Sequence, residues 1–490
     1  MPTISHLRIW QQNLNTSHTA QLTLLNSPIS NDWDILAIQE LALNSVNNTR
    51  ASMHWRVVYP TCKYTHGDKP RAVTLVNSKV STNVWRQIDF PSADVVVVQF
   101  STSNGLCTVF SIYNHNNHNN TVEEMERFLG ARGPELRPTE DDHMLWLGDF
   151  NHHHPLWDKE CNNHLFTAAA LEASGKLIDL VADYGMVQAL PKDIPTLQSS
   201  STRNWTRPDN VFCTEHTNET VVSCNMAPDK HGPKTDHVPV LTTLDMSLQA
   251  SPNSPSWNYR SVDWDKFNTA LNNALTNLAG PPRTLETAEE FQQAAHNLNL
   301  ALHQTVELSV PKTQPHPHTK RWWTQDLTKR SDELKHLRKQ VYKFRALPNH
   351  DVHASLWEKE NTLSKEIQKM KETHWKDWLN RMVGTDIWIA HKYLSNPGSD
   401  GGKTRIPTLH ITGPDGQEAQ ATMNKEKSEI LAKALFPPPP AVSTVPADHL
   451  YPEPAEKWTD ITHEQLTQTI NNLSLYKALG PDGVANIVFQ

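Results

Sequence analysis

The sequence predicts an α/β sandwich over its first half, followed by a mostly helical region. Short runs rich in β-branched and aromatic residues, bounded by Asn, Gly, Pro or Ser, recur through residues 1–245. Helical patterns with apolar residues near a 3.6-residue period lie between these runs. Strands mixed with helices are typical of packed α/β layers. Beyond residue 258 the strand runs give way to long charged helical patterns.

The expected strands are residues 7–14, 34–40, 71–78, 95–102, 107–114, 144–151, 209–214 and 238–246. Two helices are expected between them, at 121–130 and 164–184. The second ends just before Gly185, and glycine is favoured at this position because it adopts the left-handed conformation that terminates helices.

In the second half, two amphipathic helices are expected, one from Trp323 to Phe344 and one over 353–382, separated by ALPNH (346–350). Such a pair could fold as a hairpin. The linker composition of 247–258 and the polyproline stretch FPPPPA (436–441) are natural boundaries.

The charge is unevenly distributed along the chain. The net charge of −8 argues against a simple nucleic-acid coat, and residues 1–245 carry 18 Lys and Arg against 26 Asp and Glu. Residues 320–381 instead carry 15 basic against 9 acidic side chains. The two expected helices therefore offer a basic face, which leaves open both a nucleic-acid role and a plain solvated surface.

The chain shows no sign of secretion or membrane insertion. Its five cysteines form no CxxC pair, and no apolar run approaches the roughly 20 residues that span a membrane. The N-terminus lacks the charged and apolar segments of a signal peptide. We therefore expect an intracellular protein with reduced thiols and no membrane partner.

Polar side chains collect at the ends of the expected strands. They are Asn13, Glu40, Tyr113, Asn114, Asp149, Asn151, Asp209, Asp236 and His237. An isolated Asp or Asn at a strand end is usually a turn former or a helix cap. As a set, these groups suit phosphodiester hydrolysis, because Mg²⁺ prefers carboxylate oxygens and the phosphate needs hydrogen-bond donors as charge develops.

Roles can be assigned by chemistry. Glu40 is the best candidate for a metal ligand, and Asp149 for orienting and deprotonating a water nucleophile. The expected donors to the phosphate are Asn151, Tyr113 and His237. A carboxylate such as Asp209 could hold His237 in one tautomer.

Three consecutive histidines, His152–His154, follow GDFN (148–151). No other His or Cys has zinc-like spacing around them, so we interpret them as loop residues. Asp149 and Asn151 are two residues apart, and in a strand such residues face the same way. Both are expected to point into one site, with Phe150 anchored on the opposite face.

Over about residues 5–245 the chain resembles the endonuclease/exonuclease/phosphatase superfamily. The resemblance is carried, in order, by QNLN (12–15), IQE (38–40), SIYN (111–114), GDFN (148–151), RPDNVF (207–212) and TDHVPV (235–240). It implies a DNase I-like four-layer α/β sandwich over 1–246 and hydrolysis that depends on Mg²⁺, with Mn²⁺ as an alternative.

The resemblance also implies site residues. The metal ligands would be Glu40, Asn13 and Asp236; the catalytic residues Asp149, Asn151, His237, Asp209 and Tyr113; and the DNA contacts Thr196, Asn114 and Arg207. Pro208, where the family usually has an apolar residue, and Thr235, where it often has Ser, are mild departures. The loops around 61–70, 115–120 and 199–206 are expected to set target preference.

The second half resembles the region between endonuclease and polymerase in fungal, Tad-like non-LTR retrotransposons. The segments that carry this resemblance include WWTQDL (322–327), THWKDWL (373–379), DIWIAHKYL (386–394) and NKEKSEILAKALFPP (424–438). LYKALGPDGVANIVF (475–489) resembles the first fingers motif of their reverse transcriptase, with Gly480 and Gly483 allowing a tight turn.

The resulting domain prediction has a linker and helical segment over 247–318, a basic helical region over 319–435, and a proline-rich boundary with a truncated start of reverse transcriptase over 436–490. No YADD-type aspartate pair follows in this sequence, so we expect no polymerase activity from this chain.

The resemblance implies a nuclear DNA endonuclease that nicks target DNA and leaves a 3′-hydroxyl for target-primed reverse transcription. DNA is the expected substrate, and element RNA is a second partner for the basic helical region. Two alternatives stay open. The chain could be an abasic-site or phosphatase-type member of the same fold, or a catalytically silent relic that only binds nucleic acid.

Overall fold

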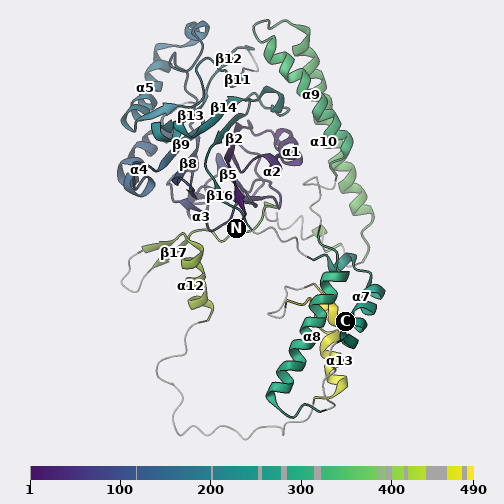
Figure 1. The fold of residues 1–490 in the computed structure, drawn as a ribbon. Helices are drawn as coiled ribbons and strands as arrows, with labels where there is room; N and C mark the ends of the chain where they lie inside the picture. Colours follow the sequence, from purple (N-terminus) through teal and green to yellow (C-terminus); the bar gives the residue numbers. More distant parts are fainter. Residues whose placement is uncertain are drawn as a thin grey trace. The chain divides into compact units, whose positions relative to one another are not determined.

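A computed structural model describes residues 2–116, 118–199, 202–251, 257–277, 284–313, 322–384, 387–388, 390–391, 400–412, 418–436, 461–476 and 483–490. The chain forms two compact units (Figure 1). One comprises residues 1–252 and 317–437, and the other comprises 253–316 and 438–490.

The first unit contains two six-stranded sheets. The strand order in one sheet is β14 (Val221–Met226), β15 (Val240–Leu244), β2 (Leu7–Asn13), β3 (Ile35–Gln39), β5 (Ala72–Asn77) and β4 (Trp55–Val58). The order in the other is β10 (Met186–Gln188), β13 (Asp209–Thr214), β9 (His143–Asp149), β8 (Gly105–Tyr113), β7 (Val95–Thr102) and β6 (Trp85–Ile88). Each sheet has one parallel pair, β2 with β3 and β8 with β9, and its other neighbours are antiparallel.

The two sheets pack face to face, and the valine run of β7 shows how. Val96 and Val98 join the core between the sheets together with residues such as Ile9 of β2. Val95 and Val97 point the other way, into a second core under helices. Because successive residues of a strand face opposite sides, a run of four valines marks a strand buried on both faces.

Helices cover the outer face of each sheet (Figure 1). On the first sheet these are α1 (His18–Asn26) and α2 (Ile29–Asp32), and on the second α4 (Asn120–Leu136) and α5 (Ala168–Asp183). The order helix, sheet, sheet, helix is a four-layer α/β sandwich, which confirms the predicted fold class.

Every strand expected from the sequence is present, within a few residues of its predicted ends. Within the two six-stranded sheets, the sequence did not predict β4, β6, β10 and β14, which are the four edge strands. Polar residues interrupt the apolar pattern of these strands: Arg86 of β6 is half-buried, and Arg56 of β4 is buried and donates to Ser78 O at 3.0 Å.

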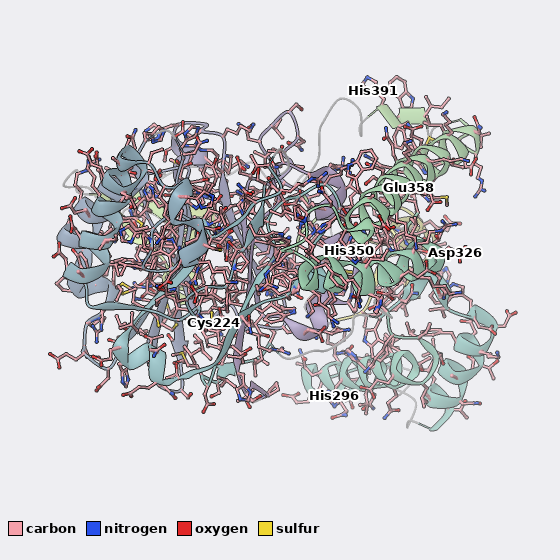
Figure 2. The ribbon with its side chains drawn as sticks, turned by 90° about the horizontal axis from the view of Figure 1, so that it is seen from above. Cys224, His296, Asp326, His350, Glu358 and His391 are labelled. Atoms are coloured by element: carbon pink, nitrogen blue, oxygen red, sulfur yellow. The ribbon has the colours of Figure 1, made fainter. Side chains whose placement is uncertain are left out.

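The predicted helical hairpin is also confirmed. It consists of α9 (Gln325–Lys343) and α10 (Asp351–Asn380), and Figure 2 marks Asp326, His350 and Glu358 along it. The apolar stripes of the two helices form a small core that includes Leu22 of α1. The hairpin therefore packs against the sandwich within the first unit.

The first unit also contains β17 (Leu409–Thr412), β18 (Glu418–Ala421) and α12 (Asn424–Leu435). The second unit contains α7 (Trp264–Asn277), α8 (Ala288–Ser309) and α13 (His463–Asn471), with Tyr259, Phe267 and Val306 in its core. None of the helices in the described parts of the chain combines the length and apolar character needed to cross a membrane.

Gly483 has φ +70°, which agrees with the turn expected there. Gly480, residues 437–441 of the polyproline stretch, and residues 386, 389 and 392–394 of DIWIAHKYL lie outside the described residues. The predicted domain boundaries stay predictions.

Candidate active site

The strand order brings the polar strand ends to one edge of the sandwich. In the parallel pair β2 and β3, Asn13 is paired with Gln39, and in β8 and β9, Tyr113 is paired with Asp149. β13 runs antiparallel to β9, so its first residue, Asp209, is also paired with Asp149. Side chains from both sheets therefore meet at this edge.

Asp149 lies at the centre of the cluster and is buried. Its Oδ2 accepts hydrogen bonds from Asn13 Nδ2 at 2.7 Å and Asn151 Nδ2 at 3.2 Å, and its Oδ1 accepts one from the Asn151 backbone N–H at 3.0 Å. Burial raises the pKa of Asp149 to about 7, although the charge of His237 opposes this effect. The carboxyl group is thus poised to exchange a proton near neutral pH.

Glu40 lies beside Asp149, just past the end of β3. Its φ is +45°, which is an uncommon value for a residue with a Cβ. Backbone conformations of this kind often mark functional sites. Its Oε1 accepts a hydrogen bond from Tyr113 Oη at 3.0 Å, and its Oε2 accepts one from Asn13 Nδ2 at 3.1 Å. The Asn13 amide therefore bridges the two carboxylates Glu40 and Asp149.

On the other side of Asp149 lies His237. Its Nδ1 is 2.8 Å from Asp209 Oδ2, and its Nε2 is 3.9 Å from Asp149 Oδ2 and 3.9 Å from Asp236 Oδ1. Burial by itself lowers the pKa of His237, but the charges of Asp209 and Asp149 outweigh it and raise the pKa to about 10. The imidazole is therefore protonated at neutral pH, and Nε2–H can donate to an anion.

Asp209 is held by further hydrogen bonds. Its Oδ1 accepts from Gln11 Nε2 at 2.9 Å, and its Oδ2 accepts from Thr196 Oγ1 at 2.7 Å. With His237 as a third partner, both oxygens of Asp209 are engaged. This arrangement fixes the orientation of the imidazole, as expected from the sequence.

Asn151 reaches Asp149 by a route that the sequence did not predict. β9 ends at Asp149, and Asn151 adopts φ +51°, so the chain turns back on itself instead of continuing as a strand. Its side chain also donates to Asn114 O at 2.6 Å. Phe150 is fully buried in the core under α4 and α5, as expected.

The three residues predicted to contact DNA are all fully buried, and their contact with DNA stays a prediction. Thr196 holds Asp209, and Asn114 donates to Phe150 O at 3.0 Å. Arg207 donates to Leu190 O at 2.7 Å, to Asn210 Oδ1 at 3.0 Å and to other backbone oxygens. The donors of these side chains are already used inside the protein. By these hydrogen bonds the side chains hold the loops around the site.

The three histidines, His152–His154, also belong to the residues that support the site. His152 is buried, and its Nε2 lies 3.3 Å from Asn114 Nδ2. Burial lowers the pKa of His152 to about 4, so the ring is neutral. His153 Nδ1 lies 3.8 Å from Asp158 Oδ2.

Within the described residues, one cluster of three side chains could hold a metal ion, Asp149, Asp209 and His237. It shares no member with the predicted ligands Glu40, Asn13 and Asp236. Both oxygens of Asp209 accept hydrogen bonds, and so do both oxygens of Glu40 on the other side of Asp149. The predicted ligand set stays a prediction.

Several supporting residues were not predicted. Gln11 holds Asp209, and Gln12 Nε2 donates to His237 O at 2.9 Å. Asn15 Nδ2 donates to Asp236 Oδ1 at 3.1 Å. The sequence does contain a pattern that could have indicated them, the polar run QQNLN (11–15) at the end of an otherwise apolar strand. Polar side chains in a buried strand need hydrogen-bond partners.

Residues 107–241 match a family model described as endonuclease-reverse transcriptase. The matched segment runs from β8 into β15 and contains Tyr113, Asp149, Asp209 and His237, whereas Glu40 precedes it. No curated protein matches the chain.

Similar solved structures include the endonuclease domain of TRAS1, a telomere-specific non-LTR retrotransposon, with 20% identity, 49% of this chain and 98% of that chain covered, and a TM-score of 0.38. AP endonuclease LMAP from Leishmania major has 14% identity, covers 50% and 88%, and has a TM-score of 0.38. A 3′-5′ exonuclease from Neisseria meningitidis has 16% identity, covers 49% and 100%, and has a TM-score of 0.37.

Proposed function

We propose that this chain is a metal-dependent DNA endonuclease of the endonuclease/exonuclease/phosphatase type. The observation that carries the proposal is the line of groups across the site, in which Asn13 bridges Glu40 and Asp149 and the His237–Asp209 pair lies beyond. Carboxylates next to a protonated donor suit hydrolysis of a phosphodiester. The family match over 107–241 supports the same assignment.

The oxygen-rich side of the site fits a hard divalent cation. Glu40 and Asp149 share one amide donor, and the raised pKa of Asp149 is typical of a buried carboxylate without enough compensating positive charge. These two residues, with Asn13 between them, would hold Mg²⁺, and Asp236, which lies beside His237, would support the metal or the water; Mn²⁺ accepts the same oxygen ligands. A bound divalent ion stabilises negative charge on the phosphate oxygens.

The protein groups would divide the remaining work. Asp149 takes a proton from a water molecule whose oxygen forms a bond to phosphorus, and the bond from phosphorus to O3′ breaks. The leaving O3′ takes a proton from solvent, which gives a 3′-hydroxyl and a 5′-phosphate. His237, oriented by Asp209, donates from Nε2 to a non-bridging phosphate oxygen, and Asn151 and Tyr113 supply further donors.

We place this activity in a Tad-like non-LTR retrotransposon protein that acts in the nucleus. The 3′-hydroxyl would prime reverse transcription, and the basic α9–α10 hairpin would contact element RNA. Support for this finer assignment comes from the sequence resemblance of the segments beyond residue 320 and from the description of the matching family.

The proposal is tested by incubating the full chain with supercoiled plasmid and Mg²⁺. We expect conversion to open circles whose nicks a DNA polymerase can extend, because extension requires a 3′-hydroxyl. Asp149→Ala and His237→Ala should abolish nicking while their circular dichroism spectra stay unchanged. If the wild-type chain does not nick but retains plasmid in filter binding, the silent nucleic-acid-binding alternative replaces the proposal. Strong preference for an abasic duplex over an intact one would instead favour a repair enzyme.

A further inference from the structure

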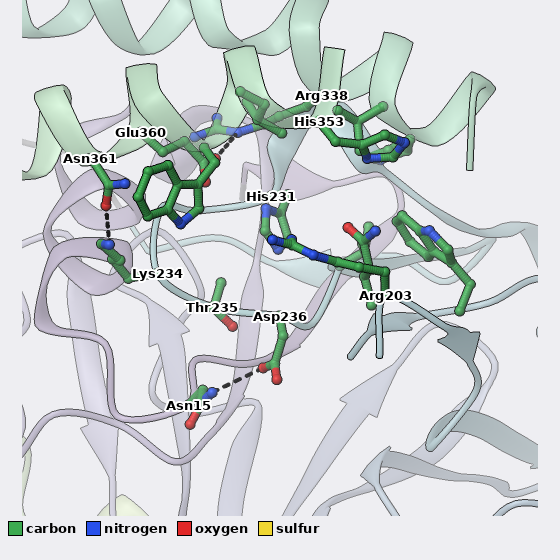
Figure 3. A pocket seen from close by; sticks show the side chains of 17 residues that line it. Asn15, Arg203, His231, Lys234, Thr235, Asp236, Arg338, His353, Glu360 and Asn361 are labelled. Carbon is green, nitrogen blue, oxygen red and sulfur yellow. Dashed lines mark hydrogen bonds and ion pairs between the residues drawn. The ribbon is translucent and has the colours of Figure 1, made fainter. Parts of the chain in front are cut away.

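A cavity of about 300 Å³ lies beside the candidate active site, between the sandwich and the hairpin (Figure 3). Asn15 and Asp236 belong to one wall, and Arg338, His353 and Glu360 come from the helices opposite. Asp236 is also the residue whose carboxylate lies 3.9 Å from the catalytic His237. The cavity therefore lies next to the catalytic cluster, with Asp236 on its wall.

A second cavity of about 420 Å³ continues the first, because both are lined by Arg203, His353 and Trp357. It extends to residues 348–351 at the turn of the hairpin. We call the two cavities together the hairpin groove. Their volumes lie in the range of about 300–1,000 Å³ that is usual for bound organic ligands, so the groove has room for a few nucleotides at most.

The groove is held open by a fixed docking of the hairpin. Lys339 Nζ lies 3.6 Å from Asp229 Oδ2, and Lys234 Nζ donates to Asn361 Oδ1. Leu22 inserts between the apolar side chains of the two helices. Both walls of the groove are therefore protein, and a base-paired duplex is too wide to lie between them.

Two buried donors on its walls lack a protein partner among the described residues, as do a few donors elsewhere such as Trp85 Nε1 and Trp146 Nε1. The Arg338 side chain is 4% exposed, and its Nε donates to Glu360 Oε1 at 3.0 Å, but its Nη2 has no acceptor. The indole Nε1 of Trp205 is likewise unsatisfied. Buried donors are nearly always hydrogen-bonded, and a ligand with acceptor oxygens in the groove would satisfy this pair.

Cations and aromatic rings alternate along the groove. Arg203, Lys234 and Arg338 lie along the groove together with the carboxylates of Asp236, Glu360 and Asp351. The side chain of Trp357 is 61% exposed, which is unusual for so large an apolar ring on a charged helix. Basic groups interleaved with accessible rings are the usual composition of sites for single-stranded nucleic acid, where phosphates pair with the cations and bases stack on the rings.

We propose that the hairpin groove binds a single-stranded segment of the substrate next to the scissile phosphate. Arg203 and Arg338 contact its phosphates, and Trp357 stacks on a base. The inference rests on the proposed function, because it takes the adjacent cluster to be the catalytic site of a nuclease. The binding itself needs no catalysis, so the two can fail separately.

The test measures fluorescence anisotropy of a labelled 12-nucleotide oligo(dT) with the full chain, in EDTA to prevent cleavage. Trp357→Ala should weaken binding about tenfold, as loss of one stacked base does. Arg203→Gln should weaken binding and reduce the slope of log K against log salt by about 0.7, the value for one phosphate contact on a single strand. Both side chains are exposed, so neither variant removes core packing.

Matched controls are Trp388→Ala, whose ring is 72% exposed and lies outside the groove, and Lys359→Gln on the exposed side of α10. Their affinities should stay within twofold of wild type. The inference is overturned if the wild type does not bind the oligonucleotide, or if groove and control variants weaken binding equally. If the groove variants alone lose affinity while plasmid is not nicked, the groove stands and the nuclease proposal falls.

Discussion

Replacing Gly148 with alanine tests how closely the backbone fixes the catalytic carboxylate. Gly148 directly precedes Asp149 and has φ +151°, a conformation that residues with a Cβ rarely adopt. A Cβ added there would lie 1.9 Å from the backbone oxygen of Ile112 on β8, whereas real Cβ contacts essentially never fall below 3.0 Å. Since the neighbour is backbone, β9 must move away from β8 by at least the difference, about 1 Å.

The size of the effect follows from that displacement. A misplacement of about 1 Å in a catalytic group can cost on the order of 100-fold in rate, which corresponds to about 2.7 kcal/mol in activation free energy. The strained backbone should in addition lower the free energy of unfolding by about 1–3 kcal/mol. We therefore expect Gly148→Ala to nick plasmid about 100-fold more slowly and to melt at a lower temperature than the wild type.

The assay compares single-turnover nicking rates and thermal unfolding with those of Gly175→Ala. Gly175 lies within α5, and a Cβ there meets nothing within 4 Å. This control should nick normally and gain up to about 1 kcal/mol of stability, because alanine is the better helix former. A Gly148→Ala variant with wild-type rate and melting temperature would refute the reasoning, since the contact between β8 and β9 could then not be tight.

Three further predictions concern charged side chains in the site and in the loops around it. Asp209→Asn removes a charge that raises the pKa of His237, so the alkaline limb of the pH–rate profile should move to lower pH by about one unit or more; an unmoved limb would exclude this coupling. Because the pKa of Asp149 is raised to about 7, its base form is lost as pH falls, and nicking should decline below about pH 7. Additional Mg²⁺ should stabilise the carboxylate and so shift this acid limb of the pH–rate profile to lower pH. If the position of the acid limb did not depend on the Mg²⁺ concentration, that would count against Asp149 as a ligand. Arg207→Met should cost about 3 kcal/mol or more in urea unfolding, because several buried acceptors lose their donor; wild-type stability would contradict the buried role.

Much of the sandwich could be predicted because its local signals agree. β7 is a run of valines that only a doubly buried strand would carry, and the ends of β2, β3, β8 and β9 are marked by polar residues. In a sheet with parallel neighbours those ends lie at one edge, so a cluster there was predictable without knowing the strand order. The pairing of Asp209 with His237 was expected from their chemistry.

Other features depend on partners far away in the chain. Arg207 was expected to contact DNA because the resemblance implies it, yet its side chain is buried, and its acceptors come from loops around 157 and 190 that only the folded chain assembles. The turn at Asn151 depends on a positive φ that a strand pattern does not predict. The hairpin groove could not be predicted either, because its two walls come from distant parts of the chain. Lys234 on one wall contacts Asn361 on the other, more than a hundred residues later.

The most direct test of the central claim compares single-turnover nicking of supercoiled plasmid by the wild type and by Asp149→Asn in Mg²⁺. Asparagine keeps the size of the side chain but cannot accept the proton of water, and its amide nitrogen replaces one of the two oxygens that accept hydrogen bonds. If Asp149 is the base of a phosphodiester hydrolase, the wild type should produce open circles with extendable 3′-hydroxyl ends. The variant should then bind DNA normally and nick at least about 100-fold more slowly. Equal rates for the two proteins, or no nicking by a folded wild type, would contradict the claim.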